Sequence, residues 1–164
     1  ISVPIFILGI LEDFTQSISP KIRLLGSILS ASLFILFFEK FIREIGIWPF
    51  DELLKNDFFS IIFTLLCIAY LTQAFNIIDG LNGLSLITAI LCLLSISIIL
   101  YQIGDFEIYV FLLYLISILF GVLVFNFPLG KIFIGDSGAY IIGLYIAGFS
   151  IILADTTKCQ VVKR

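Results

Sequence analysis

Long uninterrupted apolar runs are the feature that most restricts how this chain can fold. Each run approaches the roughly 20 residues that a helix needs to cross the hydrocarbon core of a bilayer. A shorter apolar stretch, Ile1–Leu11, has the composition of the end of a truncated span. Five complete spans are predicted at Leu24–Phe38, Phe58–Phe75, Leu84–Ile103, Tyr109–Phe125 and Ala139–Ala154.

The composition agrees with a lipid environment. Hydrophobic residues make up 61% of the chain and charged residues 13%, whereas soluble domains have about 45–50% and about 25%. Because the apolar runs are continuous rather than alternating, they exclude a transmembrane β-barrel. We therefore predict an all-α, polytopic transmembrane helix bundle, with residues 1–164 as one domain in the lipid bilayer. The small net charge of -3 argues against a nucleic-acid partner.

The chemistry open to this chain is narrowed by the residues that it lacks. It contains no histidine, which is the commonest general base near neutral pH and the commonest metal ligand. Its three cysteines show no metal-binding spacing. Any reaction must therefore depend on carboxylates, amides, lysines and backbone groups.

Unusual polar residues occur in alternate connections between the predicted spans. If each span crosses the membrane once, the first, third and fifth connections (12–23, 76–83 and 126–138) lie on the same side. These three are rich in Asp, Asn, Gly and Lys, whereas the other two have the composition of ordinary connections. A shared site on one membrane face is therefore predicted. The distribution of Lys and Arg does not decide which face it is.

The first connection begins with two adjacent carboxylates, Glu12 and Asp13, at the end of an apolar stretch. Neighbouring charges there are costly, and a bound cation would relieve them. Further on, Ser19-Pro20 predicts the start of a helix. Lys21 and Arg23 would then lie in its first turn, where the helix dipole disfavours cations. A phosphate ligand would explain them, and anchoring of the long side chains at the membrane interface is the alternative.

The second connection contains the stretch NIIDGLNG. Asn76 and Asp79 are three residues apart, which places them on one face of a helix. Two glycines three apart, Gly80 and Gly83, allow the chain to turn and to approach a ligand closely. The amide and carboxylate side chains can hydrogen-bond a flat heterocycle such as a nucleobase. A plain Asn/Gly turn between two spans is the alternative.

The third connection ends in Gly135-Asp136-Ser137-Gly138 at the head of an apolar helix. This arrangement places a carboxylate beside free backbone N–H groups. It can hold a divalent cation together with the phosphate oxygens that the cation neutralises. The alternative is that Asp136 is simply the N-cap of that helix.

Together the three motifs resemble those of the polyprenyl-phosphate N-acetylhexosamine-1-phosphate transferases. This superfamily includes GlcNAc-1-phosphate transferases and phospho-MurNAc-pentapeptide transferase. The resemblance extends from about Leu8 to Gly148, with the motifs in family order. The matching stretches are LGILEDFTQSISPKIRLL, NIIDGLNGLS and FNFPLGKIFIGDSGAYIIG.

The resemblance implies a reaction, a cofactor and a location. Members of the superfamily transfer a sugar-1-phosphate from a UDP-sugar to undecaprenyl (polyprenyl) phosphate and release UMP, with Mg²⁺ or Mn²⁺. This is the first membrane step of a cell-envelope polysaccharide such as lipopolysaccharide. The expected location is the bacterial inner membrane with the motif loops in the cytoplasm, and a homodimer is compatible with it.

The resemblance also assigns roles to individual residues. The implied catalytic residues are Glu12, Asp13 and Asp136, of which Asp13 and Asp136 are also the implied metal ligands. The implied substrate-binding residues are Lys21, Asn76, Asp79, Asn82, Asn126 and Lys131.

Three departures from the family pattern leave alternatives open. Glu12-Asp13 replaces the usual Asp-Asp, and Asn82 replaces the second Asp of DGxDG. The earliest spans and a later histidine-containing loop are absent, so the 164-residue segment alone is expected to have little or no activity. The amino-acid sequences of the motifs favour the GlcNAc-1-phosphate transferase branch of the superfamily. The alternatives are phospho-MurNAc-pentapeptide transferase, a non-catalytic homologue, and a cation-transporting fragment, which would carry charges inside its spans.

Overall fold

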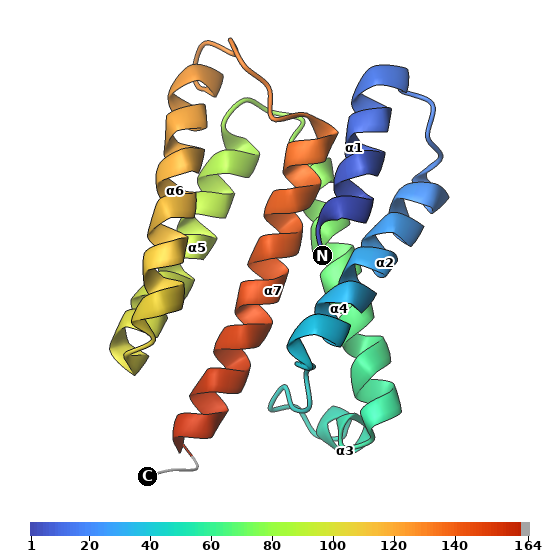
Figure 1. The fold of residues 1–164 in the computed structure, drawn as a ribbon, viewed down its shortest axis with the longest axis vertical. Helices are drawn as coiled ribbons and strands as arrows, with labels where there is room; N and C mark the ends of the chain where they lie inside the picture. The colour runs from blue at the N-terminus through green and yellow to red at the C-terminus, as the bar shows by residue number, and fades with distance from the viewer. Residues whose placement is uncertain (162–164) are drawn as a thin grey trace.

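The computed structural model describes residues 1–161, which fold into seven helices and no strand, as the all-α prediction required (Figure 1). The helices are α1 (Val3–Thr15), α2 (Pro20–Phe38), α3 (Phe50–Leu54), α4 (Asp57–Ile78), α5 (Leu84–Ile103), α6 (Phe106–Asn126) and α7 (Gly135–Val161).

Five of these helices are long and apolar enough to cross a membrane. They are α2, α4, α5, α6 and the Gly135–Thr157 part of α7. Each contains one predicted span, so the five complete spans are confirmed. The chain is an integral membrane protein. The N-terminal apolar stretch forms the shorter helix α1, which has 13 residues.

Four helices extend past the predicted spans at the predicted site, so Asn76 and Asn126, expected in connections, lie in the last turns of α4 and α6. Glu12 and Asp13, expected in a connection, lie in the last turns of α1, which ends only where Gln16 takes a left-handed conformation. Asp136, also expected in a connection, lies in the first turn of α7. Apolar runs mark the part of a helix in lipid, whereas the helical backbone continues into polar residues until a cap or a left-handed residue ends it.

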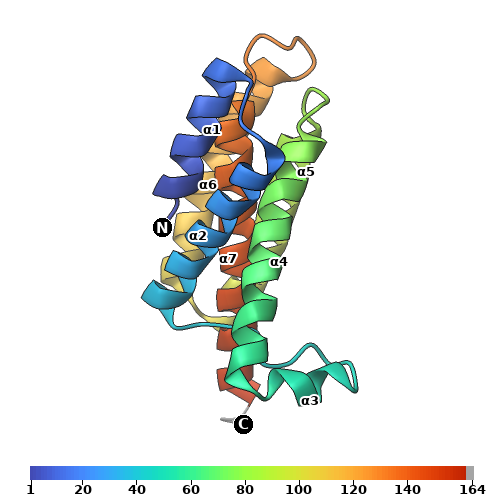
Figure 2. The same ribbon diagram turned by 90° about the vertical axis from the view of Figure 1, so that its right-hand side faces the viewer.

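Alternate connections lie at the same end of the bundle. The connections α1–α2, α4–α5 and α6–α7 gather at the top of Figures 1 and 2, and the connections containing α3 and joining α5 to α6 lie at the bottom. The three motif-bearing segments therefore share one end of the bundle, as counting of the spans predicted. We call it the motif end.

Helix α7 is the centre of the bundle and contributes to two buried clusters. One joins α7 to α5 and α6, and the other joins it to α1 and α2. Hydroxyl and amide groups also bind helices together. Gln73 Nε2 on α4 donates to Ser27 Oγ on α2 at 2.6 Å, and the Ile5 backbone N–H donates to Ser30 Oγ at 3.2 Å. Such small polar contacts hold helices together in lipid, where apolar burial alone gives little preference for protein over lipid.

Candidate functional site

The N-terminus of α7 is capped by a carboxylate from another helix. Asp13 on α1 accepts from the Asp136 backbone N–H at 2.7 Å, and from the N–H and hydroxyl of Ser137 at 3.2 and 2.8 Å. A negative charge here satisfies unpaired N–H groups and complements the helix dipole. Asp13, and not Asp136, therefore caps α7. The carboxylate of Asp136 is directed to another partner, which is Arg23.

Two glycines allow α1 and α7 to approach this closely. A Cβ atom on Gly9 would lie 2.4 Å from Ser137 Cα. Gly135 has a φ of +71°, and a Cβ atom there would lie 2.8 Å from Asp13 Oδ2. Any side chain at either position would separate the carboxylate from the helix end that it caps.

We expect Gly9→Ala to lower stability by about 2 kcal/mol, because the added methyl meets backbone rather than a flexible side chain. The matched control is Gly121→Ala on α6, where an added Cβ has no heavy atom within 4 Å. The control should be neutral or up to about 1 kcal/mol stabilising from helix propensity. Melting temperatures in detergent, followed by circular dichroism, compare the two, and equal values for both variants would contradict the close contact.

Arg23 joins the carboxylates of two other helices. Its Nη1 lies 3.2 Å from Asp136 Oδ2 on α7 and 3.6 Å from Glu12 Oε1 on α1. Glu12 also accepts from the Ile18 backbone N–H at 2.8 Å, which holds the connection to α2 in place. The Arg23 Nε is buried and has no hydrogen-bond partner. Protein carboxylates, rather than phosphate alone, thus account for a cation in the first turn of α2.

The sequence marked Arg23 only as a cation that a phosphate ligand would explain, and the family resemblance assigned it no role. A cation in the first turn of a helix opposes the dipole, and such a cost points to an anionic partner. Its partner Asp136 lies 113 residues away in the sequence, so that contact was not accessible from local spacing. Ser137 and Tyr140 were missed for the same reason.

The C-terminal end of α4 reaches the motif end through Asn76, and Asp79 directly follows this helix. Asn76 Oδ1 accepts from the hydroxyl of Tyr140 at 3.3 Å, and Tyr140 is fully buried on α7. Asp79 accepts from the hydroxyl of Ser85. Partial burial raises the pKa of Asp79, and the negative charges of Asp136 and Asp13 raise it further, while the Ser85 hydrogen bond opposes the shift. The three carboxylates are therefore close enough to interact.

The raised pKa of Asp79 gives a signed stability prediction. Ionising this group costs more in the folded state, so stability falls as pH rises from the ordinary aspartate value through the raised pKa. We expect Asp79→Asn to raise the melting temperature at neutral pH and to lose this advantage in acid, where Asp79 is protonated. Glu107→Gln, which neutralises an exposed carboxylate at the opposite end, is the control. A pH-independent difference between Asp79→Asn and the parent would contradict the prediction.

Asn126 connects the two loops of the motif end. Its Oδ1 accepts from the Gly83 backbone N–H at 2.5 Å, and its Nδ2 donates to the Ile132 carbonyl at 2.7 Å. The residue is 4% exposed. Both polar groups are thus used inside the protein, and Asn126 shapes the loops that a substrate would meet.

The remaining predicted substrate-binding residues lie on the surface of the motif end. Asn82 is exposed, and its Nδ2 would lie 2.7 Å from a Cβ atom on Gly130, so the two loops touch there. Lys21 and Lys131 are exposed and form no ion pair with any described residue. Their ammonium groups are free to meet an anionic ligand.

Asp13 and Asp136 could supply carboxylate ligands to a Mg²⁺ ion. Among the side chains that the structure describes, no group of three or more His, Cys, Asp or Glu residues could hold a metal ion by itself. Mg²⁺, however, is commonly bound by one or two carboxylates together with waters and substrate phosphates. Asp13 and Asp136 meet that need, since each carboxylate oxygen retains accepting capacity beside the bonds described above.

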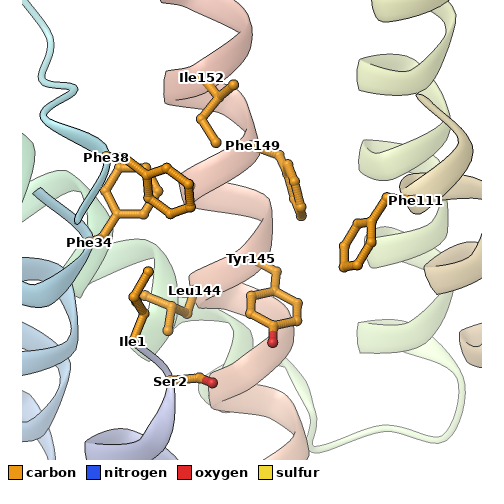
Figure 3. Close-up of a pocket in the computed structure, with 10 residues that line it drawn as sticks. Ile1, Ser2, Phe34, Phe38, Phe111, Leu144, Tyr145, Phe149 and Ile152 are labelled. Atoms are coloured by element: carbon orange, nitrogen blue, oxygen red, sulfur yellow. The ribbon is translucent and has the colours of Figure 1, made fainter. Parts of the chain in front are cut away.

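An apolar cavity of about 310 Å³ lies away from this site. Phe34 and Phe38 of α2 line one side of it, Phe111 of α6 lies opposite, and Tyr145 and Phe149 of α7 lie between them (Figure 3). No carboxylate, lysine or arginine lines it. It therefore has no groups for phosphate chemistry, and the motif end remains the candidate site.

The motif end thus gathers carboxylates and cations at one end of a membrane-spanning bundle, an arrangement suited to binding anionic groups. The family model for glycosyl transferase family 4 matches residues 1–154, and the chain belongs to that family. The family consists of glycosyl-phosphate transferases that act on polyprenyl phosphate, which agrees with the resemblance noted above.

Two relatives illustrate the likeness. The phospho-N-acetylmuramoyl-pentapeptide-transferase of Streptococcus pneumoniae strain CGSP14 is 30% identical over 154 residues, and that of strain ATCC BAA-255 / R6 is 29% identical. Each match covers 90% of this chain and 47% of the relative. The chain therefore spans about half the length of these curated relatives.

Proposed function

We propose that the chain carries the site for transfer of an N-acetylhexosamine-1-phosphate from a UDP-sugar to undecaprenyl phosphate, with release of UMP. The observation that carries this proposal is the junction of α1, α2 and α7, where Asp13, Arg23 and Asp136 meet. The Asn76–Asp79 segment lies at the same end. Family membership supplies the class of reaction.

The proposed step is a single displacement at phosphorus. An oxygen of the lipid phosphate forms a bond to the β-phosphorus, and the bond from that phosphorus to the bridging oxygen breaks, so UMP leaves with the bridging oxygen. Asp13 and Asp136 would hold Mg²⁺, which supplies charge neutralisation on the diphosphate when bound. The exposed ammonium groups of Lys21 and Lys131 would attract the phosphates to this end.

The end of α4 and the α4–α5 loop are proposed to bind the nucleotide. Asn76 is already oriented by Tyr140, and Asn82 is exposed beside the α6–α7 loop. Asp79 is held by Ser85 at the loop's end. Fixed amide and carboxylate groups of this kind discriminate between heterocycles, because an unsuitable base leaves them unpaired.

Two UDP-sugars are candidate donors for this site. The amino-acid sequences of the motifs favour UDP-GlcNAc. The relatives described above are named phospho-N-acetylmuramoyl-pentapeptide-transferase, and this name favours UDP-MurNAc-pentapeptide. An assay with undecaprenyl phosphate, Mg²⁺ and each donor in turn measures UMP release. It should be run on the 164-residue chain and on the longest form of the protein that the cell produces, since the chain spans about half of its relatives.

Turnover with one donor would support the transferase and assign its branch. If both forms of the protein bind the donor but neither releases UMP, the chain is a non-catalytic homologue and the proposed activity is wrong. Metal-dependent ion flux into vesicles without UMP release would favour the transport alternative. Against transport, the carboxylates and cations of the site lie at the ends of the spans rather than along them.

A further inference from the structure

The segment between α2 and α4 exposes a set of large apolar side chains at the end of the bundle opposite the motif end. Trp48 is 82% exposed, and helix α3 projects sideways from the base of α4 (Figure 2). We call residues 45–55 the foot. Its exposed apolar residues are Ile45, Ile47, Trp48, Phe50 and Leu53.

The foot is attached firmly to the bundle. The backbone of Ile42 donates to Thr64 Oγ1 at 2.8 Å and accepts from Ser60 Oγ at 2.5 Å, so the chain leading into the foot is bonded to α4. Leu54 at the end of α3 is 4% exposed and packs as part of the buried core. Asp51 accepts from the Ile45 backbone N–H at 2.8 Å. The apolar side chains are therefore held outward by the fold.

We propose that the foot lies in the interfacial layer of the bilayer and binds lipid there. It connects the ends of two membrane spans, so it is continuous with the lipid-facing surface of the bundle. Aromatic residues, tryptophan above all, concentrate at this layer. A short helix with apolar and charged residues side by side is the kind of element that lies in the plane of the interface.

Charged groups on the foot favour lipid over a second copy of the chain. Glu52 and Lys55 pair at 2.6 Å, and their side chains are 60% and 68% exposed beside Leu53 and Phe50. A protein partner covering the apolar residues would remove water from this pair, whereas hydrated headgroups leave it solvated. The five-residue helix also offers far less surface than the roughly 800 Å² per partner of a stable interface.

The position of the foot in the bilayer determines how deep the motif end lies in the membrane. Helix α4 has 22 residues and thus a length of roughly 33 Å, close to the roughly 30 Å thickness of the hydrocarbon core. With the foot at one interface, Asp79 at the far end of α4 lies at the other. That is the level at which a lipid phosphate sits. This consequence for the acceptor rests on the proposed function, whereas lipid binding by the foot does not.

The single tryptophan of the chain makes the test direct. The unmodified 164-residue chain is reconstituted in phosphatidylcholine vesicles whose acyl chains carry bromine either near the headgroup or near the bilayer centre. Trp48 fluorescence should be quenched at least twofold more by the shallow bromines. The matched control moves the fluorophore to the lipid-exposed middle of α6, as Tyr114→Trp in a Trp48→Phe background, and should show the reverse order.

Two results would overturn the proposal. Quenching by iodide in the water, with no effect of either brominated lipid, would place Trp48 in solvent. A shift of the Trp48 emission when the protein-to-lipid ratio is lowered tenfold, again without bromine quenching, would show that the foot contacts a second copy of the chain. The measurement involves no catalytic activity, so its failure is distinct from a failure of the proposed reaction.

Discussion

Asp136→Asn is expected to reduce UMP release by about 10³-fold and to lower the melting temperature much less than Arg23→Met, because Arg23 keeps Glu12 as a counter-ion. The substitution keeps the shape of the side chain and an oxygen that can accept from Arg23, which lies 3.2 Å away. It removes the negative charge that would hold a divalent cation against the diphosphate. Loss of one preorganised electrostatic contact at a reacting phosphate or carbonyl typically costs about 10²–10³ in rate, and the loss of a metal ligand is more damaging.

Ser137→Ala provides the control at the neighbouring position. It removes the hydroxyl that donates to Asp13 but keeps the backbone N–H that donates to the same carboxylate. We expect a loss of no more than about tenfold, in line with one hydrogen bond of about 1 kcal/mol. Rates and apparent Mg²⁺ affinities of both variants separate a metal-binding role from a capping role. Equal losses in the two variants would argue that Asp136 acts only through the helix end.

Arg23→Met is expected to lower the free energy of unfolding by about 3 kcal/mol. It leaves Glu12 and Asp136 without their common counter-ion, and their side chains are only 15% and 30% exposed. Removing one member of a largely buried ion pair costs about 3–5 kcal/mol, because the remaining charge is left uncompensated. Met preserves most of the apolar stem, so lost packing contributes little.

Two further variants separate charge from general disturbance. Arg23→Lys retains one cation but replaces the planar guanidinium by a compact ammonium, and should recover part of the lost stability. Lys55→Met breaks an exposed ion pair on the foot and should cause no measurable change. Chemical denaturation in mixed micelles, with SDS as denaturant, measures all three. An Arg23→Met variant as stable as Lys55→Met would show that the junction of α1, α2 and α7 does not depend on this arginine.

The spans and their arrangement were predictable because lipid imposes a strong rule on sequence. An apolar run such as Leu84–Ile103 coincides with α5 because its ends are set by Gly83 and Gly104, both in left-handed conformations. Convergence of the motifs followed from the alternation of crossings. Both inferences depend only on where apolar runs begin and end along the chain, and these positions can be read directly from the sequence.

The chemistry of the junction depends on contacts between segments and was only partly predictable. Adjacent carboxylates at the end of α1 indicated a site, but their spacing does not show that Asp13 caps α7 while Glu12 meets Arg23. The fixed role of Asn126 is a similar case, since its partners lie in two different loops. The helix α3 carried no signal because five residues are too few to produce a periodic pattern.

Helix α6 lies at the edge of the bundle. Among the described residues, its backbone lies close to α5 only, and it reaches α7 through side chains such as Phe111 and Phe149, whose ring centroids are 5.7 Å apart. Helix α7, by contrast, is joined to α1 at backbone distance. Helix α5 is therefore the element through which α6 is anchored at backbone distance, since α5 itself packs against α4 and α7. Asn126 adds a second anchor at the motif end, because it bonds the α4–α5 loop to the α6–α7 loop and so couples the positions of the two loops.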